Sequence, residues 1–163
     1  MPTLSKVRAG KRAAMRAGEA GTRTEYIAFG LAGETYAVPI AQLAEILRPP
    51  PITGVPRAPR TVVGVVSVRG RLVTVIDLRT RIRLPPAPMD HRSRILLVDG
   101  GTEHIGFVVD EVQQVWRLSP EEIEPSNVLG GDQAAHIAGI GRPAGVEGAM
   151  LILLDLRPLA ESP

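Results

Sequence analysis

The chain of 163 residues contains no cysteine. Without a thiol it cannot form a disulfide, bind a metal through sulfur or use a cysteine nucleophile. A reducing cytoplasm is compatible with this composition.

Long apolar runs are also missing. A membrane-spanning helix needs about 20 consecutive apolar residues, whereas the longest candidates here, such as residues 149–154, have the length of a strand. The basic N-terminus is similar to the start of a signal peptide, but Gly10, Lys11, Arg12 and Arg16 interrupt any apolar region behind it. We therefore expect a soluble, cytoplasmic protein without membrane insertion.

The motifs of common enzyme classes are absent from the sequence. There is no phosphate-binding Gly-Lys-Ser/Thr loop and no Gly-x-Ser-x-Gly around a nucleophile. The segment GIGRPAG at 139–145 differs in spacing from a dinucleotide-binding loop, and Pro143 with no strong helix after it provides no helix N-terminus for a pyrophosphate. We interpret this segment as the tip of a hairpin.

Histidines and carboxylates give no clear chemical centre either. His91, His104 and His136 are widely separated and lack the spacing of metal ligands. The acidic stretches at 110–111 and 121–124 are typical of solvated faces. These patterns predict a protein that is not an enzyme and has no cofactor, metal or small-molecule substrate. An enzyme with an unrecognised site is an alternative, and it would need a polar pocket with perturbed titratable groups.

Charge is distributed unevenly along the chain. The formal net charge is +2, but the first 23 residues carry an excess of basic side chains, which leaves the rest net acidic. The basic residues of this tail are Lys6, Arg8, Lys11, Arg12, Arg16 and Arg23, against Glu19 alone. With almost no large apolar groups the tail cannot bury enough surface to fold. We expect a disordered tail at 1–23 and a folded domain at 24–160.

The basic tail opens a second functional alternative, a small β-barrel that binds nucleic acid through residues 1–23. Nucleic-acid-binding barrels combine a basic groove with stacked aromatic side chains. Here the aromatic content is 3% and the region after the tail is net acidic. These features disfavour nucleic acid as a partner of the folded region.

From Thr24 onward, short β patterns alternate with turn signals. We expect strands at 24–31 and 35–38, a hairpin at 62–68 and 71–76, two or three strands within 93–118, and a final hairpin within 136–154. One or two helical turns are expected within 39–47, and SPEE at 119–122 is a capping box that predicts a helix of about a turn and a half. Proline-rich segments at 48–59 and 84–90 are expected to be surface connections.

Two similar pentapeptides suggest an internal repeat. VIDLR at 75–79 and LLDLR at 153–157 each close a hairpin, and a glycine turn at Gly33 or Gly100 precedes each of them. Two similar β modules explain this pattern, although aliphatic strands can also resemble one another by chance. Asp77 and Asp155 are expected to be helix N-caps in preference to catalytic groups.

The stretch VVGVVSVRGRLVTVIDLR at 62–79 places one arginine within an aliphatic run. Consecutive apolar residues predict strands that are covered on both faces. Gly70 can adopt a positive φ at a tight turn, which would hold Arg69 at a projecting corner. Such an arginine either keeps a hairpin tip solvated or contacts a partner. Its planar guanidinium group is well suited to binding carboxylates.

This segment, with ETYAVPIAQLAEIL upstream and HIGFVVDEVQQV and MLILLDL downstream, resembles the CheW family, the coupling proteins of bacterial chemotaxis arrays. The resemblance runs in order from Thr24 to Leu159. It implies an all-β fold with a few short helices, in which two intertwined five-stranded SH3-like β-barrels share an apolar interface. The same domain ends the kinase CheA, but no kinase or phosphotransfer region is present here, so a stand-alone coupling protein is expected.

The resemblance also implies a function and a set of contact residues. It implies an adaptor between the cytoplasmic tip of a chemoreceptor, a methyl-accepting chemotaxis protein, and the regulatory domain of a CheA-type histidine kinase, in chemotaxis or a related motility or developmental pathway. Such an adaptor is cytoplasmic and joins receptor arrays at the membrane. The implied partner-binding residues are Arg69 with its ion-pair partner Glu45, Gly70, and the groove residues Leu43, Gly64, Val112 and Val115.

The sequence departs from the family pattern at two positions. Ser67 replaces a frequent Asn, and Thr74 replaces a frequent Pro and keeps an N–H for the strand ladder. An exposed ion pair adds little to folding stability. If Arg69 and Glu45 are both exposed, Arg69→Ala should therefore weaken partner binding and barely change the melting temperature.

Overall fold

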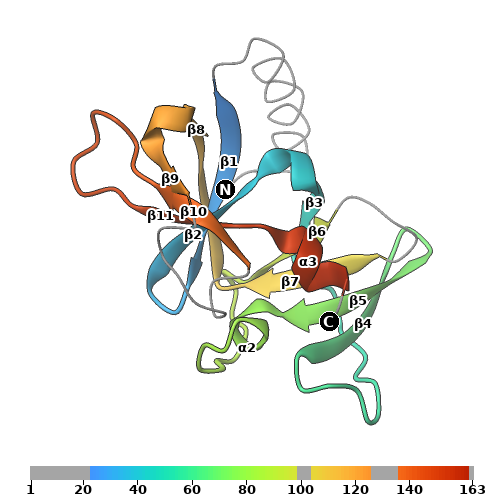
Figure 1. Ribbon diagram of the computed structural model, residues 1–163. Helices are drawn as coiled ribbons and strands as arrows, with labels where there is room; N and C mark the ends of the chain where they lie inside the picture. Colours follow the sequence, from blue (N-terminus) through green and yellow to red (C-terminus); the bar gives the residue numbers. More distant parts are fainter. Residues whose placement is uncertain (1–22, 99–103, 126–135, 162–163) are drawn as a thin grey trace.

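The computed structural model describes residues 23–98, 104–125 and 136–161, and almost all regular structure in these ranges is β (Figure 1). Residues 1–22 of the tail expected at 1–23 lie outside them, as does the Gly100 turn. The strands are β1 (Thr24–Leu31), β2 (Glu34–Pro39), β3 (Leu43–Leu47), β4 (Val62–Val68), β5 (Arg71–Asp77), β6 (Arg94–Val98), β7 (Ile105–Val109), β8 (Glu111–Leu118), β9 (Ile123–Pro125), β10 (Ile137–Gly141) and β11 (Leu151–Leu154). The short helices are η1 (Ile40–Gln42), α2 (Leu78–Arg81), η2 (Pro120–Glu122) and α3 (Leu156–Glu161).

The strands form two sheets. The first sheet has the order β8-β1-β2-β11-β10-β9 and the second has the order β3-β6-β7-β5-β4. Neighbouring strands are antiparallel except for the pairs β2–β11 and β5–β7, which are parallel. In the described ranges no helix is both long and apolar enough to cross a membrane.

The two halves of the chain exchange strands reciprocally. The hairpin β1–β2 belongs to the first sheet, but the next strand, β3, pairs with β6 in the second sheet. The hairpin β6–β7 belongs to the second sheet, but the next strand, β8, pairs with β1 in the first. Apart from β9, the strand orders of the two sheets correspond position by position, which supports the repeat suggested by the two pentapeptides.

The first sheet has one strand more than expected. β9 has only three residues and pairs with the edge strand β10. The second sheet has at the corresponding edge a single bridge between Thr53 and Val65 of β4. The proline-rich connection at 48–59 therefore crosses the surface, as expected, and also contributes one β-bridge to the second sheet.

Buried apolar side chains form three clusters. The largest lies between the sheets and draws on both halves of the chain, with Phe29, Ile76, Phe107 and Leu156 fully buried. A second cluster around Val75 and a third around Leu153 belong to the second and first sheets. Because a fully buried Leu, Ile or Phe contributes about 1.5–3 kcal/mol, the shared cluster is the main attachment between the modules.

The prediction that the hairpin at 62–76 is covered on both faces is wrong in part. β4 is an edge strand, and the start of β5 at Arg71 and Leu72 is exposed. The strands with every residue buried are β6 and β7 in the interior of the second sheet. Successive valines in β4 and β5 therefore indicated high β propensity and not complete burial.

The expected helix caps are present. The Asp77 carboxylate accepts hydrogen bonds from the Arg79 N–H and the Thr80 hydroxyl at the start of α2. Asp155 accepts from the Arg157 N–H at the start of α3. Both aspartates are N-caps, as predicted.

Two further local predictions have mixed outcomes. The capping box at 119–122 forms, but it starts a single 3-10 turn and not a turn and a half of helix. The segment 39–47 contains one turn, η1, and then becomes strand β3. At the position where the family often has Pro, the Thr74 N–H donates to the His104 carbonyl at 3.0 Å, as expected for a strand ladder.

Gly64 is required by a close approach of two backbone segments. The Thr53 N–H donates to the Val65 carbonyl at 3.0 Å, and the Val65 N–H donates to the Thr53 carbonyl at 2.8 Å. A Cβ on Gly64 would lie 2.2 Å from the Thr53 carbonyl oxygen. A side chain here must therefore displace the connection that covers β4.

We expect Gly64→Ala to lower the free energy of unfolding by about 1–3 kcal/mol because the added methyl group overpacks this contact. Gly54→Ala is the matched control, since a Cβ there meets nothing within 4 Å. The control should stay within about 0.5 kcal/mol of wild type. Urea unfolding measures the free energy of unfolding of both variants. Equal losses would show that the close approach of Thr53 does not exclude a side chain at residue 64.

Candidate functional site: the Arg69 turn

The turn between β4 and β5 holds Arg69 in a strained conformation. Both central residues have positive φ, 51° for Arg69 and 78° for Gly70. A two-residue hairpin of this type needs positive φ at both positions, and Asn-Gly or Asp-Gly usually provides it. Arg69 has a Cβ that disfavours the left-handed region, so the surrounding structure must hold it there.

A bidentate ion pair fixes the arginine. Arg69 Nη1 donates to Oε2 of Glu45, and Nη2 donates to Oε1, both at 2.6 Å. Because of these hydrogen bonds and the opposite charge, Glu45 raises the pKa of the Arg69 guanidinium. Parallel hydrogen bonds of this kind fix orientation as well as distance.

The ion pair also links the two ends of the second sheet. Glu45 lies on β3 and Arg69 follows β4, and these strands are at opposite ends of the sheet order. Their side chains meet because the sheet curls until its first and last strands approach each other. The pair therefore helps to close the second sheet into a barrel.

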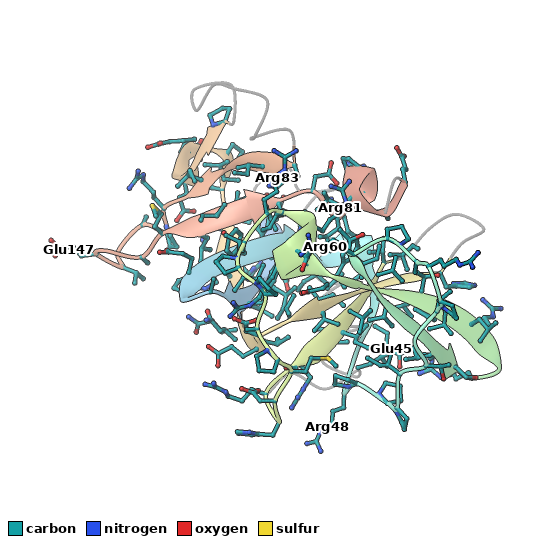
Figure 2. The ribbon with its side chains drawn as sticks, turned by 90° about the horizontal axis from the view of Figure 1, so that it is seen from below. Glu45, Arg48, Arg60, Arg81, Arg83 and Glu147 are labelled. Carbon is teal, nitrogen blue, oxygen red and sulfur yellow. The ribbon has the colours of Figure 1, made fainter. Side chains whose placement is uncertain are left out.

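The partners differ strongly in exposure. The Arg69 side chain is 60% exposed, whereas the Glu45 side chain is 6% exposed. The premise that both partners are exposed is therefore wrong, and Glu45 is a buried carboxylate covered by an exposed arginine (Figure 2 labels Glu45). A buried carboxylate that loses its partner is destabilised much more than an exposed one.

The structure does not place the other sequence-predicted residues on one surface. Leu43 is fully buried in the shared cluster and Val112 is 6% exposed in the same cluster, so neither offers a side chain to a partner. Gly64 is buried beneath the proline-rich connection. Val115 is 41% exposed on β8. Among the contact residues predicted from the sequence, only Gly70 and Glu45 lie directly at the Arg69 turn.

Sequence reasoning missed an exposed leucine beside this turn. Leu72, the second residue of β5, is 71% exposed. The inward residues Val73 and Val75 belong to the second cluster, so strand alternation points Leu72 outward. This alternation was the available signal, but it was hidden by the continuous apolar run.

A second ion pair connects the modules. Arg79 Nε donates to Oδ1 of Asp110 at 2.8 Å, and its Nη2 donates to Oδ2 at 2.5 Å. Asp110 Oδ2 also accepts from the Ala32 N–H in the β1–β2 turn. The prediction that residues 110–111 form a solvated face is therefore wrong for Asp110, which connects α2 to the first sheet.

The pKa of Asp110 follows from these contacts. Burial raises the pKa, but the hydrogen bonds from Arg79 and Ala32 outweigh burial, and the net effect lowers the pKa. Within residues 23–98, 104–125 and 136–161, no group of three or more His, Asp or Glu side chains is placed to hold a metal ion.

Fold and site together define a class of protein. Its members consist of two β modules that exchange strands, and they present an ion-paired arginine turn on the surface. Residues 25–163 match the family model described as the CheW-like domain. The chain therefore belongs to the CheW-like family, the scaffold and coupling proteins of bacterial chemotaxis.

Individual relatives agree with this assignment. The chemotaxis protein CheW of Klebsiella aerogenes is 30% identical over 139 residues, which cover 85% of this chain and 82% of that protein. Protein FrzA of Myxococcus xanthus is 30% identical over 138 residues, covering 84% and 86%. The crystal structure of scaffolding protein TtCheW from Thermoanaerobacter tengcongensis has a TM-score of 0.73 and 28% identity, covering 82% of this chain and 89% of that chain. The resemblance seen in the sequence and the predicted double SH3-like fold are both confirmed.

The ion pair generates a stability prediction that replaces the sequence-based one. Arg69→Ala should lower the melting temperature by several degrees because it leaves Glu45 buried without its partner. Arg69→Ala combined with Glu45→Gln should recover part of the loss, since the double variant has no buried charge. Thermal unfolding of the two single variants and the double variant forms a double-mutant cycle. Additive losses would show that the two side chains do not stabilise one another.

Asp110 generates a prediction about pH. Its folded pKa is lowered, so its contribution to stability is present above its usual pKa of 3.8 and is lost as the pH falls through the lowered folded value. Asp110→Asn should remove this contribution and flatten the decline of the melting temperature below about pH 4. Glu147→Gln, at the far tip of the β10–β11 hairpin (Figure 2), is the control and should retain the wild-type slope. Identical slopes in all three proteins would contradict the prediction.

Proposed function

We propose that this chain is a non-enzymatic adaptor that joins the cytoplasmic tip of a chemoreceptor to the regulatory domain of a CheA-type histidine kinase. The observation that carries the proposal is the ion-paired, strained Arg69 turn on a fold whose relatives are chemotaxis coupling proteins. An adaptor at the receptor tip works in the cytoplasm and is recruited to membrane-associated arrays through the receptors.

The Arg69 turn is suited to protein recognition because it is already organised. The ion pair and the hairpin hold the guanidinium in one place, so binding does not have to order a long side chain. A guanidinium has five N–H donors, and the hydrogen bonds to Glu45 use two of them. The remaining donors can reach a carboxylate of the partner.

Leu72 adds an apolar contact beside this charge. An arginine next to an exposed aliphatic side chain resembles the hot spots of protein interfaces, where a few central residues provide most of the affinity. We propose Arg69, Glu45, Gly70 and Leu72 as one contact surface, with Val115 on β8 as a further exposed apolar position. Leu43, Gly64 and Val112 support the surrounding structure in this proposal.

The experiment is a titration of the full chain with regulatory domains of the organism's CheA-type kinases and with receptor cytoplasmic fragments. We expect Arg69→Ala and Leu72→Asn to weaken at least one of these complexes about tenfold or more. Leu72 is mostly exposed, so its variant should fold normally and separates binding from stability.

Arg142→Ala is the matched control. Arg142 is 56% exposed and pairs with Glu124 at 2.9 Å, but it lies beyond β10 in the first sheet. Its variant should bind like wild type. If the wild-type chain binds none of the kinases and receptor fragments, the proposal fails.

Deletion of residues 1–23 is a further arm of the same experiment, because the nucleic-acid alternative depends on the tail. Kinase and receptor binding should survive the deletion. Binding to nucleic acid that disappears with the tail and falls steeply with salt would favour the alternative.

A further inference from the structure

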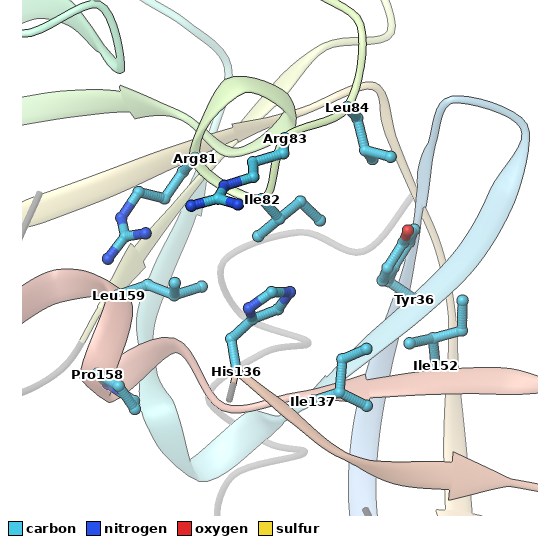
Figure 3. A pocket seen from close by; sticks show the side chains of 10 residues that line it. All are labelled: Tyr36, Arg81, Ile82, Arg83, Leu84, His136, Ile137, Ile152, Pro158 and Leu159. Carbon is cyan, nitrogen blue, oxygen red and sulfur yellow. The ribbon is translucent and has the colours of Figure 1, made fainter. Parts of the chain in front are cut away.

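A cavity of about 620 Å³ lies on the side of the molecule where α2 faces the first sheet (Figure 3). Sites for small molecules usually have volumes between about 300 and 1,000 Å³. The end of α2 and the turn after it line one side, and β2, β10, β11 and α3 line the other. The cavity is therefore built by both modules and is separate from the Arg69 turn.

The lining combines an apolar surface with positive charge. Aliphatic side chains come from β10, β11, α3 and the turn after α2, with the Tyr36 ring beside them. The basic side chains are Arg81, Arg83 and His136, and none of the ten described lining residues is Asp or Glu. Figure 3 shows both guanidinium groups on one side of the cavity with His136 facing them.

Arg83 occupies a backbone position that favours glycine. Its φ is 65°, and it follows the last turn of α2, where the Arg83 N–H donates to the Thr80 carbonyl and the Leu84 N–H donates to the Arg79 carbonyl. This is the Schellman arrangement that usually ends with glycine in the left-handed region. A strained arginine at such a position is a reason to look for a function of its side chain.

The electrostatics of the cavity disfavour additional positive charge. Burial lowers the pKa of His136, and the positive charge of Arg81 lowers it further. Arg83 has no ion pair with a carboxylate among the residues that the structure describes. An anion would therefore meet favourable charge without displacing a carboxylate from Arg83.

We propose that this cavity binds a small organic anion, with a carboxylate or phosphate head at Arg83 and an apolar body against the aliphatic lining. Guanidinium groups recognise both types of head in the same geometry. A bound molecule would contact both modules. The inference does not depend on the adaptor function, because the cavity residues are separate from those of the Arg69 turn.

The test uses the full chain labelled with ¹⁵N and titrated with hexanoate and hexyl phosphate. We expect saturable amide shifts at the lining residues, such as Ile137, Ile152 and Leu159. Hexylammonium has the same body with the opposite charge, whereas acetate and inorganic phosphate have the head without the body. These three probes should bind at least about tenfold more weakly than hexanoate or hexyl phosphate, because each lacks one of the two contacts.

Arg83→Gly separates binding from folding. Glycine relieves the left-handed strain, so the variant should unfold at a temperature equal to or above that of wild type. Its affinity for hexanoate should fall about tenfold with the loss of charge-assisted hydrogen bonds. The matched control is Arg57→Gly, which removes an exposed arginine from the same backbone region, with φ 62°, outside the cavity. Its affinity should be unchanged.

Four results would overturn the proposal. Absence of saturable shifts at millimolar hexanoate and hexyl phosphate would show that the cavity takes no such ligand. Equal affinity for hexanoate and hexylammonium would show an apolar cavity without anion selectivity. Equal loss of affinity in Arg83→Gly and Arg57→Gly would show that the binding reflects a general attraction of anions to the protein. Binding of acetate as tight as that of hexanoate would show the same.

Discussion

The apolar cluster between the two sheets is the constraint on which the rest of the structure depends. It contains side chains from both hairpins, β1–β2 and β6–β7, and from both of the strands that cross between the sheets. Because β3 and β8 leave the hairpins that precede them, each sheet is completed by the opposite half of the chain. Neither module can therefore move far from the other without exposing the cluster and breaking a strand pairing.

The exchange also positions the Arg69 turn. Glu45 lies on the crossing strand β3, and its neighbour Leu43 is fully buried in the shared cluster. Arg69 lies on the hairpin at the other end of the same sheet. The surface geometry at this arginine is thus set by packing at the junction of the modules, and an adaptor gains from such coupling because its contact residues are held before a partner arrives.

Much of this fold could be predicted from the sequence because its signals are local. Alternating apolar residues located the strands, Gly70 located the turn, and Asp77 and Asp155 marked the caps. The contact of Arg69 with Glu45 came from family resemblance and not from spacing. The burial of Glu45, the Asp110–Arg79 pair and the cavity beside α2 depend on residues distant in sequence, and single-sequence patterns contain no information on their distances. The exposure of Leu72 was missed because the continuous apolar run hid the alternation along β5. The sixth strand, β9, was missed because its three residues end in a proline.

The parallel pairing of β2 with β11 has a consequence for the order of folding. β2 ends at Pro39 and β11 starts at Leu151, so more than a hundred residues separate the paired strands. Pairings of such high contact order form slowly because a long loop must close first. During synthesis, the N-terminal hairpin emerges well before the segments that cover it, and until then its apolar face depends on transient protection from aggregation.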